Sequence, residues 1–403
     1  MVDDDPRLLR SRDQVLSVLV HHGSVSRTEL AATTGLAPGT VARALRGLLA
    51  SGAVREVAPD PAAPVRRGRP LARFVVAEAE GAVVGIDLGL SRIVAGLASA
   101  SGTIVRERAV TVDERATAAQ LCAAAAAVVG DLLETCGLSR ADVLRAVATV
   151  PAPVDPVTGR VEDAPVVVDA WRGTHPAALL EQVLGLPLIV VNDANAAALA
   201  EHRSGAGRGC GNLVYLHATS GVGAGLVLDG EVRTGTAGGA GEIGHIRLHG
   251  ASELCRCGQR GCLESEASTA ALARKMVTVG VAVMGGRFED TVREHLGDPV
   301  VARLLTQAGA ALGSVLAEMC NVLSPEVVVI GGELAAGGEA VTAGVRESMR
   351  RYALSSVSRR VRIELCGLGA RAAMLGAVAA AVSEAARPSS RHVAAVPAAR
   401  ASL

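Results

Sequence analysis

One pattern of residues occurs twice in this chain and limits the folds open to it. Residues 82–112 read as three short apolar strands joined by tight turns at Gly89 and Gly102. Residues 212–235 repeat the same order of strand, glycine turn, strand, glycine turn and strand. Helical segments and further strands follow each set, beginning with an Ala-rich helix at about 117–136. The repetition predicts an internally duplicated α/β protein with two lobes and a cleft between them.

The composition favours a soluble, cytoplasmic protein of several domains. A chain of 403 residues is too long for one ordinary domain, and its 40 basic and 40 acidic residues point to no partner by total charge. No uninterrupted apolar run approaches the roughly 18 residues that a membrane span needs, and the acidic N-terminus is unlike a signal peptide. No membrane partner is therefore expected. In the cytoplasm, the eight cysteines are more readily thiols or metal ligands than disulfides.

Residues 7–52 have the spacing of apolar residues that is typical of three short helices. The second helix opens with Ser26 and Glu29, a capping-box pattern, and the segment TGLAPG joins it to the third as a helix-turn-helix requires. Residues 53–78 have an apolar start, a middle rich in Pro and Arg, and an apolar return. This last segment fits either a β-wing or a linker.

Positive charge on these segments favours DNA binding over a helical protein-interaction domain, which stays the alternative. The third helix carries polar and basic residues away from its apolar face, and the second helix begins with an arginine. The run RRGRP is similar to the basic arms that enter minor grooves. The predicted DNA-binding residues are Arg27, Thr40, Arg43, Arg46, Arg66, Arg67 and Arg69.

Three cysteines lie within eight residues and follow a histidine, in the spacing H-x9-C-x-C-x4-C. Gly258 and Gly261 would let the chain fold back so that the thiolates converge. Three thiolates and one imidazole make a closed tetrahedral shell, which suits one structural zinc ion per chain. The predicted ligands are His245, Cys255, Cys257 and Cys262. The alternative is a set of buried or redox cysteines beside an unrelated histidine.

Several polar residues stand where a ligand cleft is expected. The run LPLIVV predicts a buried strand, and Asp193 follows it at a strand-to-helix junction, although Asn192 or Asp193 could equally be a helix cap. Glu242 and Glu264 bracket the cysteine cluster, where local salt bridges are the alternative. The glycine-rich runs DLGLSR and TSGVGAG could cradle phosphate, although glycine at hairpin corners is ordinary.

The segments GGAGEIGH and CRCGQRGCLE resemble the signature of the ROK family, which groups sugar-responsive repressors and sugar kinases. VPAPVDPVTGRV, LPLIVVNDANAAALAEH, SGVGAGLVLDG and VVVIGGEL extend the resemblance over about residues 81–382. It implies a two-lobe actin-like ATPase (sugar kinase) fold, and an added N-terminal winged helix-turn-helix is typical of the family's regulators. It also implies the four zinc ligands named above, and sugar contacts from Asn192, Asp193, Glu242, His245 and Glu264. Asp193 corresponds to the catalytic base of the kinases.

Two departures from the family's kinases favour a sensor over an enzyme. The kinases carry Asp-x-Gly-Gly-Thr in their first phosphate loop, whereas this chain has Leu90 in place of the second glycine and Ser91 in place of the threonine. A Pro-Gly on the sugar side is Pro151-Ala152 here. The sequence therefore predicts a transcriptional regulator, most simply a repressor, that binds operator DNA as a homodimer and responds to a sugar or sugar derivative. The alternatives are an ATP-dependent sugar kinase with a DNA-binding domain and a protein-interaction adaptor.

These patterns divide the chain into four expected parts. Residues 1–80 are expected to form a winged helix-turn-helix domain, and residues 81–195 an N-terminal lobe. Residues 196–385 are expected to form a C-terminal lobe with the zinc site, whose final helix packs back on the N-terminal lobe. Residues 386–403 have no sustained periodicity, which predicts a disordered tail.

Overall fold

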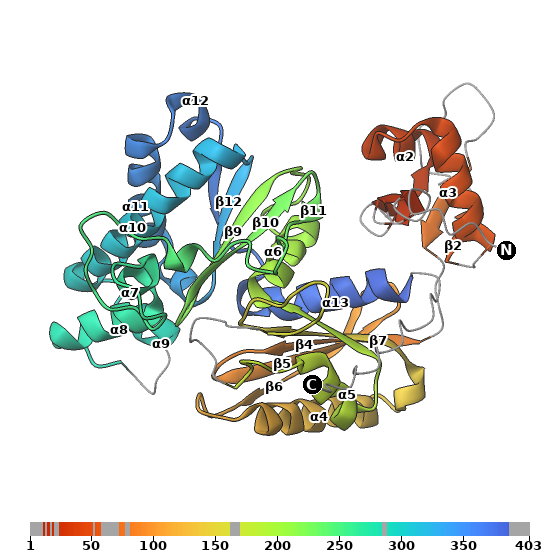
Figure 1. Ribbon diagram of the computed structural model, residues 1–403, viewed down its shortest axis with the longest axis horizontal. Coiled ribbons are helices and arrows are strands. Elements are labelled where there is room, and N and C mark those ends of the chain that lie inside the picture. Colours follow the sequence, from red (N-terminus) through yellow and green to blue (C-terminus); the bar gives the residue numbers. More distant parts are fainter. Residues whose placement is uncertain are drawn as a thin grey trace, which may run out of the picture. The chain divides into compact units, whose positions relative to one another are not determined.

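The computed structural model describes residues 11–12, 14–16, 18–19, 24–50, 53–57, 72–76, 81–161, 170–283 and 288–386. Two compact units make up the chain: residues 1–80 with 382–403, and residues 81–381 (Figure 1). Most of the expected C-terminal tail, residues 387–403, lies outside the described residues.

In the part of the N-terminal unit that the structure describes, residues 11–12, 14–16 and 18–19 are helical, and two complete helices and a small antiparallel sheet follow. The helices are α2 (Arg27–Thr34) and α3 (Pro38–Ala50). The strands are β1 (Val25–Ser26), β2 (Val54–Val57) and β3 (Arg73–Val76), in the order β1-β3-β2. Since β2 and β3 pair with each other, the apolar ends of residues 53–78 form a β-ribbon rather than a free linker.

The predicted capping box at the start of α2 is confirmed. The Ser26 hydroxyl accepts a hydrogen bond from the Glu29 amide at 3.3 Å, and the Glu29 carboxylate accepts one from the Ser26 amide at 2.7 Å. Helix α2 ends at Thr34, and the residue that caps it, Gly35, has a left-handed conformation (φ 67°) that favours glycine. The buried side chains of Leu30, Leu45 and Phe74 then join both helices and the sheet in one core.

The two strand sets of the larger unit form two sheets with the same topology. The first sheet has the order β6-β5-β4-β7-β8 and the second β11-β10-β9-β12-β13. In each, an antiparallel three-strand meander is continued by two parallel strands. The first sheet comprises β4 (Ala82–Leu88), β5 (Arg92–Ser99), β6 (Ile104–Thr111), β7 (Val143–Val150) and β8 (Leu188–Asn192). The second comprises β9 (Leu213–Ala218), β10 (Val222–Leu228), β11 (Glu231–Val232), β12 (Val327–Gly331) and β13 (Arg362–Leu365). The predicted duplication is confirmed.

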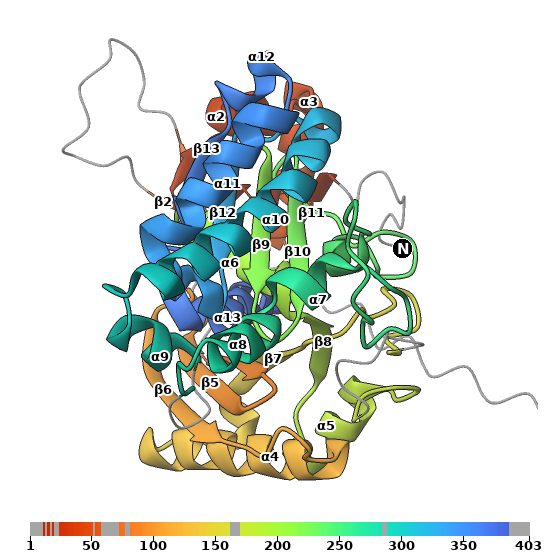
Figure 2. The same cartoon turned by 90° about the vertical axis from the view of Figure 1, so that its left-hand side faces the viewer.

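Helices cover both faces of each sheet, as Figures 1 and 2 show. On the first sheet, α4 (Ala118–Thr135) and α5 (Pro176–Leu184) lie opposite α13 (Ala372–Ala385). On the second, α10 (Pro299–Leu323) and α11 (Gly338–Tyr352) lie opposite α6 (Asp193–Ser204). The shorter helices are α7 (Leu263–Ala267), α8 (Thr269–Thr278), α9 (Phe288–Glu294) and α12 (Ser355–Ser358). Short 3-10 turns are η1 (Arg140–Asp142), η2 (Ile243–His245), η4 (Glu333–Gly337) and η5 (Gly369–Arg371).

Helices α6 and α13 pack closely on the sheets and on each other at positions where glycine leaves the backbone without a side chain. Gly85 and Gly96 are direct cross-strand partners, and a Cβ on either would collide with α13. Gly225 of β10 approaches the start of α6 in the same way. The two helices meet where a Cβ at Gly376 would lie 1.8 Å from the Ala196 carbonyl oxygen. The expected lobe boundary at 195/196 therefore falls inside α6, and α13 packs on the first sheet.

One sequence expectation is wrong. The LPLIVV segment is predicted as a buried strand, but β8 is an edge strand of the described sheet and Ile189 is 41% exposed.

Among the described helices, α4 and α10 are long and apolar enough to cross a bilayer by length and composition alone. Both supply buried residues to the cores of their lobes, Val129 in one case and Leu312 in the other. Their apolarity is that of core helices.

Candidate functional site

A cleft of about 700 Å³ opens where strand ends of the two lobes face each other. Its walls come from the turns after β4 and β9, the β8–α6 junction, η2, α7 and η4. All five predicted sugar-contact residues line it: Asn192, Asp193, Glu242, His245 and Glu264. The topology explains this convergence, because the ends of parallel strands and the helices that follow them meet at one edge of a sheet.

At the β8–α6 junction, the adjacent residues Asn192 and Asp193 have different roles, one as a helix cap and one at the cleft. Asn192 is the N-cap of α6, since its side-chain oxygen accepts from the Asn195 amide at 3.0 Å. Its amide nitrogen donates to the Ala152 carbonyl at 3.2 Å and to Asp193 Oδ1 at 3.1 Å. Asp193 Oδ1 also accepts from the Ala194 amide at 2.7 Å. Asn192 is therefore the cap, and Asp193 presents its other oxygen to the cleft.

A histidine that the sequence analysis missed lies beside this carboxylate. Nε2 of His217, on β9, is 3.4 Å from Asp193 Oδ2. Burial lowers the pKa of His217, but the negative charges of Asp193, Asp87 and Glu333 outweigh it, so the pKa is raised overall. The only signal in the sequence was one polar residue inside the apolar run LVYLHA.

Two further acids of the cleft are held by threonines. Asp87, at the end of β4, accepts from the Thr149 hydroxyl at 2.7 Å, and burial raises the pKa of Asp87 to about 6. Glu333 accepts from the Thr269 hydroxyl at 2.9 Å, and burial likewise raises the pKa of Glu333. These carboxyl groups gain protons more readily than exposed acids, because desolvation penalises the charged form.

Glu264 and Glu242 occupy the side of the cleft nearest the cysteines. Glu264 is only 4% exposed, and its carboxylate accepts from the Val222 amide at 3.2 Å and from Arg256 at 3.4 Å. Arg256 also donates to the Ser220 carbonyl at 2.7 Å, which ties the cysteine loop to the glycine turn after β9. Burial raises the pKa of Glu242 to about 7, and the charges of Asp193 and Glu264 add to this effect. The local salt bridge considered for Glu264 thus exists, within the cleft wall.

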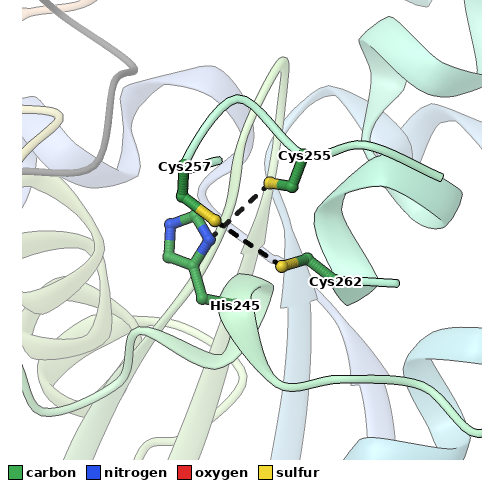
Figure 3. Close-up of side chains that lie close together, drawn as sticks. All are labelled: His245, Cys255, Cys257 and Cys262. Carbon is green, nitrogen blue, oxygen red and sulfur yellow. Dashed lines mark hydrogen bonds between the residues drawn. The ribbon is translucent and has the colours of Figure 1, made fainter. Parts of the chain in front are cut away.

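The predicted metal ligands form one cluster (Figure 3). The ligand atoms of His245, Cys255, Cys257 and Cys262 all lie within 4.8 Å of one another. Nδ1 of His245 faces Cys255 Sγ at 3.8 Å, and the sulfur atoms of Cys257 and Cys262 are 3.7 Å apart. This set of three thiols and one imidazole could hold a metal ion, and it matches the donor set of structural zinc.

Glycine makes the fold of the cysteine loop possible. Gly258 and Gly261 have left-handed backbones, with φ of 85° and 78°. A Cβ at Gly261 would also lie 2.5 Å from the Ala251 carbonyl oxygen. Since His245 also lines the cleft, the cluster and the acidic side chains share one wall.

The glycine-rich turns have unequal structural roles. Gly225 is required by α6, whereas a Cβ at Gly223 would meet only Ala194 at 3.9 Å. Leu90 lines the cleft, and its φ is not in the positive range that is costly for residues other than glycine. Arg92, two residues further along the chain, donates to the Ala370 carbonyl at 3.3 Å.

The predicted DNA-binding residues divide into described and undescribed groups. Arg43 and Arg46 are exposed on α3, opposite the buried Val41 and Leu45, and Thr40 is half-buried. The Arg27 guanidinium stacks 5.3 Å from the centre of the Phe74 ring. Arg55, exposed on β2, adds a basic residue that the sequence analysis did not select. Residues Arg66, Arg67 and Arg69 lie outside the described residues.

Known proteins that resemble this chain fall into two groups, which differ in how much of it they cover. The xylose repressor of Caldicellulosiruptor bescii is 26% identical over 384 residues, which cover 92% of this chain and 94% of the repressor. A solved ROK family transcriptional regulator, a homologue of the E. coli MLC protein, shares the fold with a TM-score of 0.75 at 24% identity, over 95% of this chain and 97% of its own. The ROK family glucokinase from Streptomyces griseus, solved with glucose and AMPPNP, is 31% identical with a TM-score of 0.65.

The extents differ at the N-terminal unit. The glucokinase covers 75% of this chain and 99% of its own, whereas matches over 92% and 95% of this chain must include much of residues 1–80. The sequence model of the ROK family matches residues 83–384, which span both sheets and the cleft. The chain belongs to the ROK family.

Proposed function

We propose that this protein is a sugar-responsive transcriptional repressor of the cytoplasm. Residues 1–80 form its winged helix-turn-helix domain, which binds operator DNA, and the cleft of the larger unit binds a sugar or sugar derivative. The observation that carries the proposal is the pairing of a basic, exposed α3 with a ligand cleft in one chain whose regulator relatives match it nearly end to end. Because operators are commonly read as two half-sites, the protein acts as a homodimer.

The DNA proposal is tested with variants of α3. Arg43→Ala or Arg46→Ala should weaken binding to a specific genomic fragment by about 1–3 kcal/mol, because each removes a side chain able to reach a base edge. Arg303→Ala, an exposed arginine of α10, is the matched control and should bind like wild type. Fluorescence anisotropy at several salt concentrations gives the affinities. A full-length protein that binds no genomic fragment at low salt would rule out a regulator.

The sugar proposal is tested at Asp193. Asp193→Asn should keep the fold and DNA binding but weaken the response to xylose, glucose or another sugar of a hexose and amino-sugar panel. The loss should be roughly 1.5–3 kcal/mol, since a charge-assisted hydrogen bond is removed. Calorimetric titration of wild type and variant measures it. An unchanged titration would reduce Asp193 to a structural residue of the helix start.

The cysteine cluster is proposed to bind one structural zinc ion per chain through His245, Cys255, Cys257 and Cys262. A closed shell of four protein ligands leaves no position for water, so the metal would stabilise the loop rather than react. When bound, it would fix the wall that carries Glu242, His245 and Glu264. Nδ1 of His245 faces the sulfur atoms, which leaves its other ring nitrogen for a sugar hydroxyl.

The second candidate function is an ATP-dependent sugar kinase that carries a DNA-binding domain. The retained carboxylate of Asp193 and the bare backbone at Gly223 favour it. Leu90 and Ala152 disfavour it, because a side chain stands in each place where the family's kinases have glycine. We therefore regard the protein as a sensor rather than an enzyme.

A further inference from the structure

His217 is an ionisable group of the cleft to which the proposed function gives no role. It lies on β9, the central strand of the second sheet, and its direct partners on the neighbouring strands are Gly223 and Gly331. Neither partner has a side chain, and beside Gly331 the space that a Cβ would take is filled by the Tyr215 ring. Its nearest charged contact is Asp193, 3.4 Å away at the start of α6.

The contact determines what Asp193 can still bind. Two donors already face Asp193 Oδ1, the Ala194 amide at 2.7 Å and the Asn192 side chain at 3.1 Å. Nε2 of His217 faces the other oxygen, Oδ2. A carboxylate oxygen has two lone pairs, so Oδ2 keeps one acceptor position, suited to one hydroxyl of a ligand.

Negative charge surrounds His217 from several elements. Asp87 on β4, Asp193 on α6 and Glu333 on η4 all favour its protonated form, while Tyr215 of its own strand stacks beside it with ring centres 5.9 Å apart. Nδ1 of His217 is buried and has no hydrogen-bond partner among the described residues. Protonation of that nitrogen is therefore favoured by the charges of these three carboxylates and not by a direct acceptor.

We propose that His217 is a positioning residue of the sugar site, which holds Asp193 with one lone pair directed at the sugar and offsets the negative charge that the ligand desolvates. The proposal rests on the proposed function, in that the cleft takes a sugar. It has a consequence for pH. Ligand binding removes water from Asp87, Asp193 and Glu333, which costs less while His217 carries a positive charge. Sugar affinity is thus full below the pKa of His217 and falls as pH rises through it.

The first experiment needs no sugar. The imidazole signals of the full-length protein are followed by NMR from pH 5 to pH 9, with His217→Gln identifying the signal that disappears. In wild type this signal should titrate above the ordinary value of about 6.5, and in Asp193→Asn its midpoint should move to lower pH. An identical midpoint in both proteins would overturn the contact with Asp193.

The second experiment measures affinity for xylose and glucose, with the same panel of sugars, between pH 6 and pH 9. Wild-type affinity should fall about fivefold more across this range than that of His217→Gln, whose amide still donates a hydrogen bond but does not titrate. Glu242 titrates near the same range in both proteins, so only the difference between them counts. His217→Leu should bind weakly at every pH, and the exposed control His249→Gln should follow wild type.

The two levels of failure are distinct. If no sugar of the panel binds wild type at any pH, the proposed function itself fails. If wild type binds but His217→Gln shows the same affinity and the same pH profile, only the role of His217 fails.

Discussion

Single residues decide how closely the two lobes can approach, and Gly376 is the sharpest case. A Cβ there would lie 1.8 Å from the Ala196 carbonyl oxygen, which is backbone and cannot swing away. Gly376→Ala should therefore lower the free energy of unfolding by at least about 1–3 kcal/mol, the usual effect of overpacking. Urea unfolding followed by circular dichroism measures the change.

The control is a helical glycine with free space. A Cβ at Gly130, inside α4, would meet nothing within 4 Å. Gly130→Ala should stabilise the protein by about 0.5–1 kcal/mol, because alanine restricts the unfolded chain and favours helix. If both substitutions have the same effect, the contact between α6 and α13 is not tight.

Residue roles were predictable from the sequence only where their partners are local. Ser26 and Glu29 form the predicted capping box, and Asn192 is the helix cap that its position suggested, because each bonds within three residues. His217 and Gly85 were not predicted, since their roles come from Asp193 and from α13, which lie far away in the sequence. A glycine in a strand shows what it accommodates only once the cross-strand pairing is known.

At the scale of elements, the cysteine loop is the segment most open to test. Cys257→Ser should lose the metal and destabilise the C-terminal lobe, because a structural site contributes its binding energy to folding. Metal analysis of protein purified without chelator should find about one zinc ion per chain in wild type. Cys136→Ser, which alters a partly exposed cysteine outside the cluster, should keep both metal and thermal stability. Wild-type protein without zinc would refute the site.

Helices and strands were predicted best where the pattern of apolar residues and the position of turn residues agree. The meanders were correctly predicted at β4–β6 and β9–β11, because short apolar runs are bounded by glycine turns in both. The burial of β8 was predicted wrongly, since a continuous Ile/Val run cannot distinguish a central strand from an edge strand. The convergence of the four metal ligands needed only spacing and glycine, so local sequence was sufficient.

At the scale of the whole molecule, the duplicated sheets explain why a sensor can share a fold with kinases. Each lobe buries its own core, and α6 and α13 each pack across to a sheet. Asp193 and Glu264 line the same cleft, so in the proposed function a ligand that touches both would favour one arrangement of the lobes over others. Nothing in that step requires phosphate transfer, because the shift follows from binding alone.

The same geometry predicts what separates this chain from a kinase. Leu90 does not have a positive φ, and its side chain lies at the cleft, where it would obstruct a nucleotide. Ala152 is buried, and its carbonyl accepts a hydrogen bond from the Asn192 side chain. Wild type should therefore consume no ATP with any sugar of the panel, while Leu90→Gly with Ala152→Gly should gain measurable turnover, since glycine lets backbone amides approach phosphate. A coupled assay for ADP formation measures both proteins. Wild-type turnover near the ~1–100 s⁻¹ of ordinary kinases would make the second candidate function correct, because Asp193 would then act as a base despite its contact with His217.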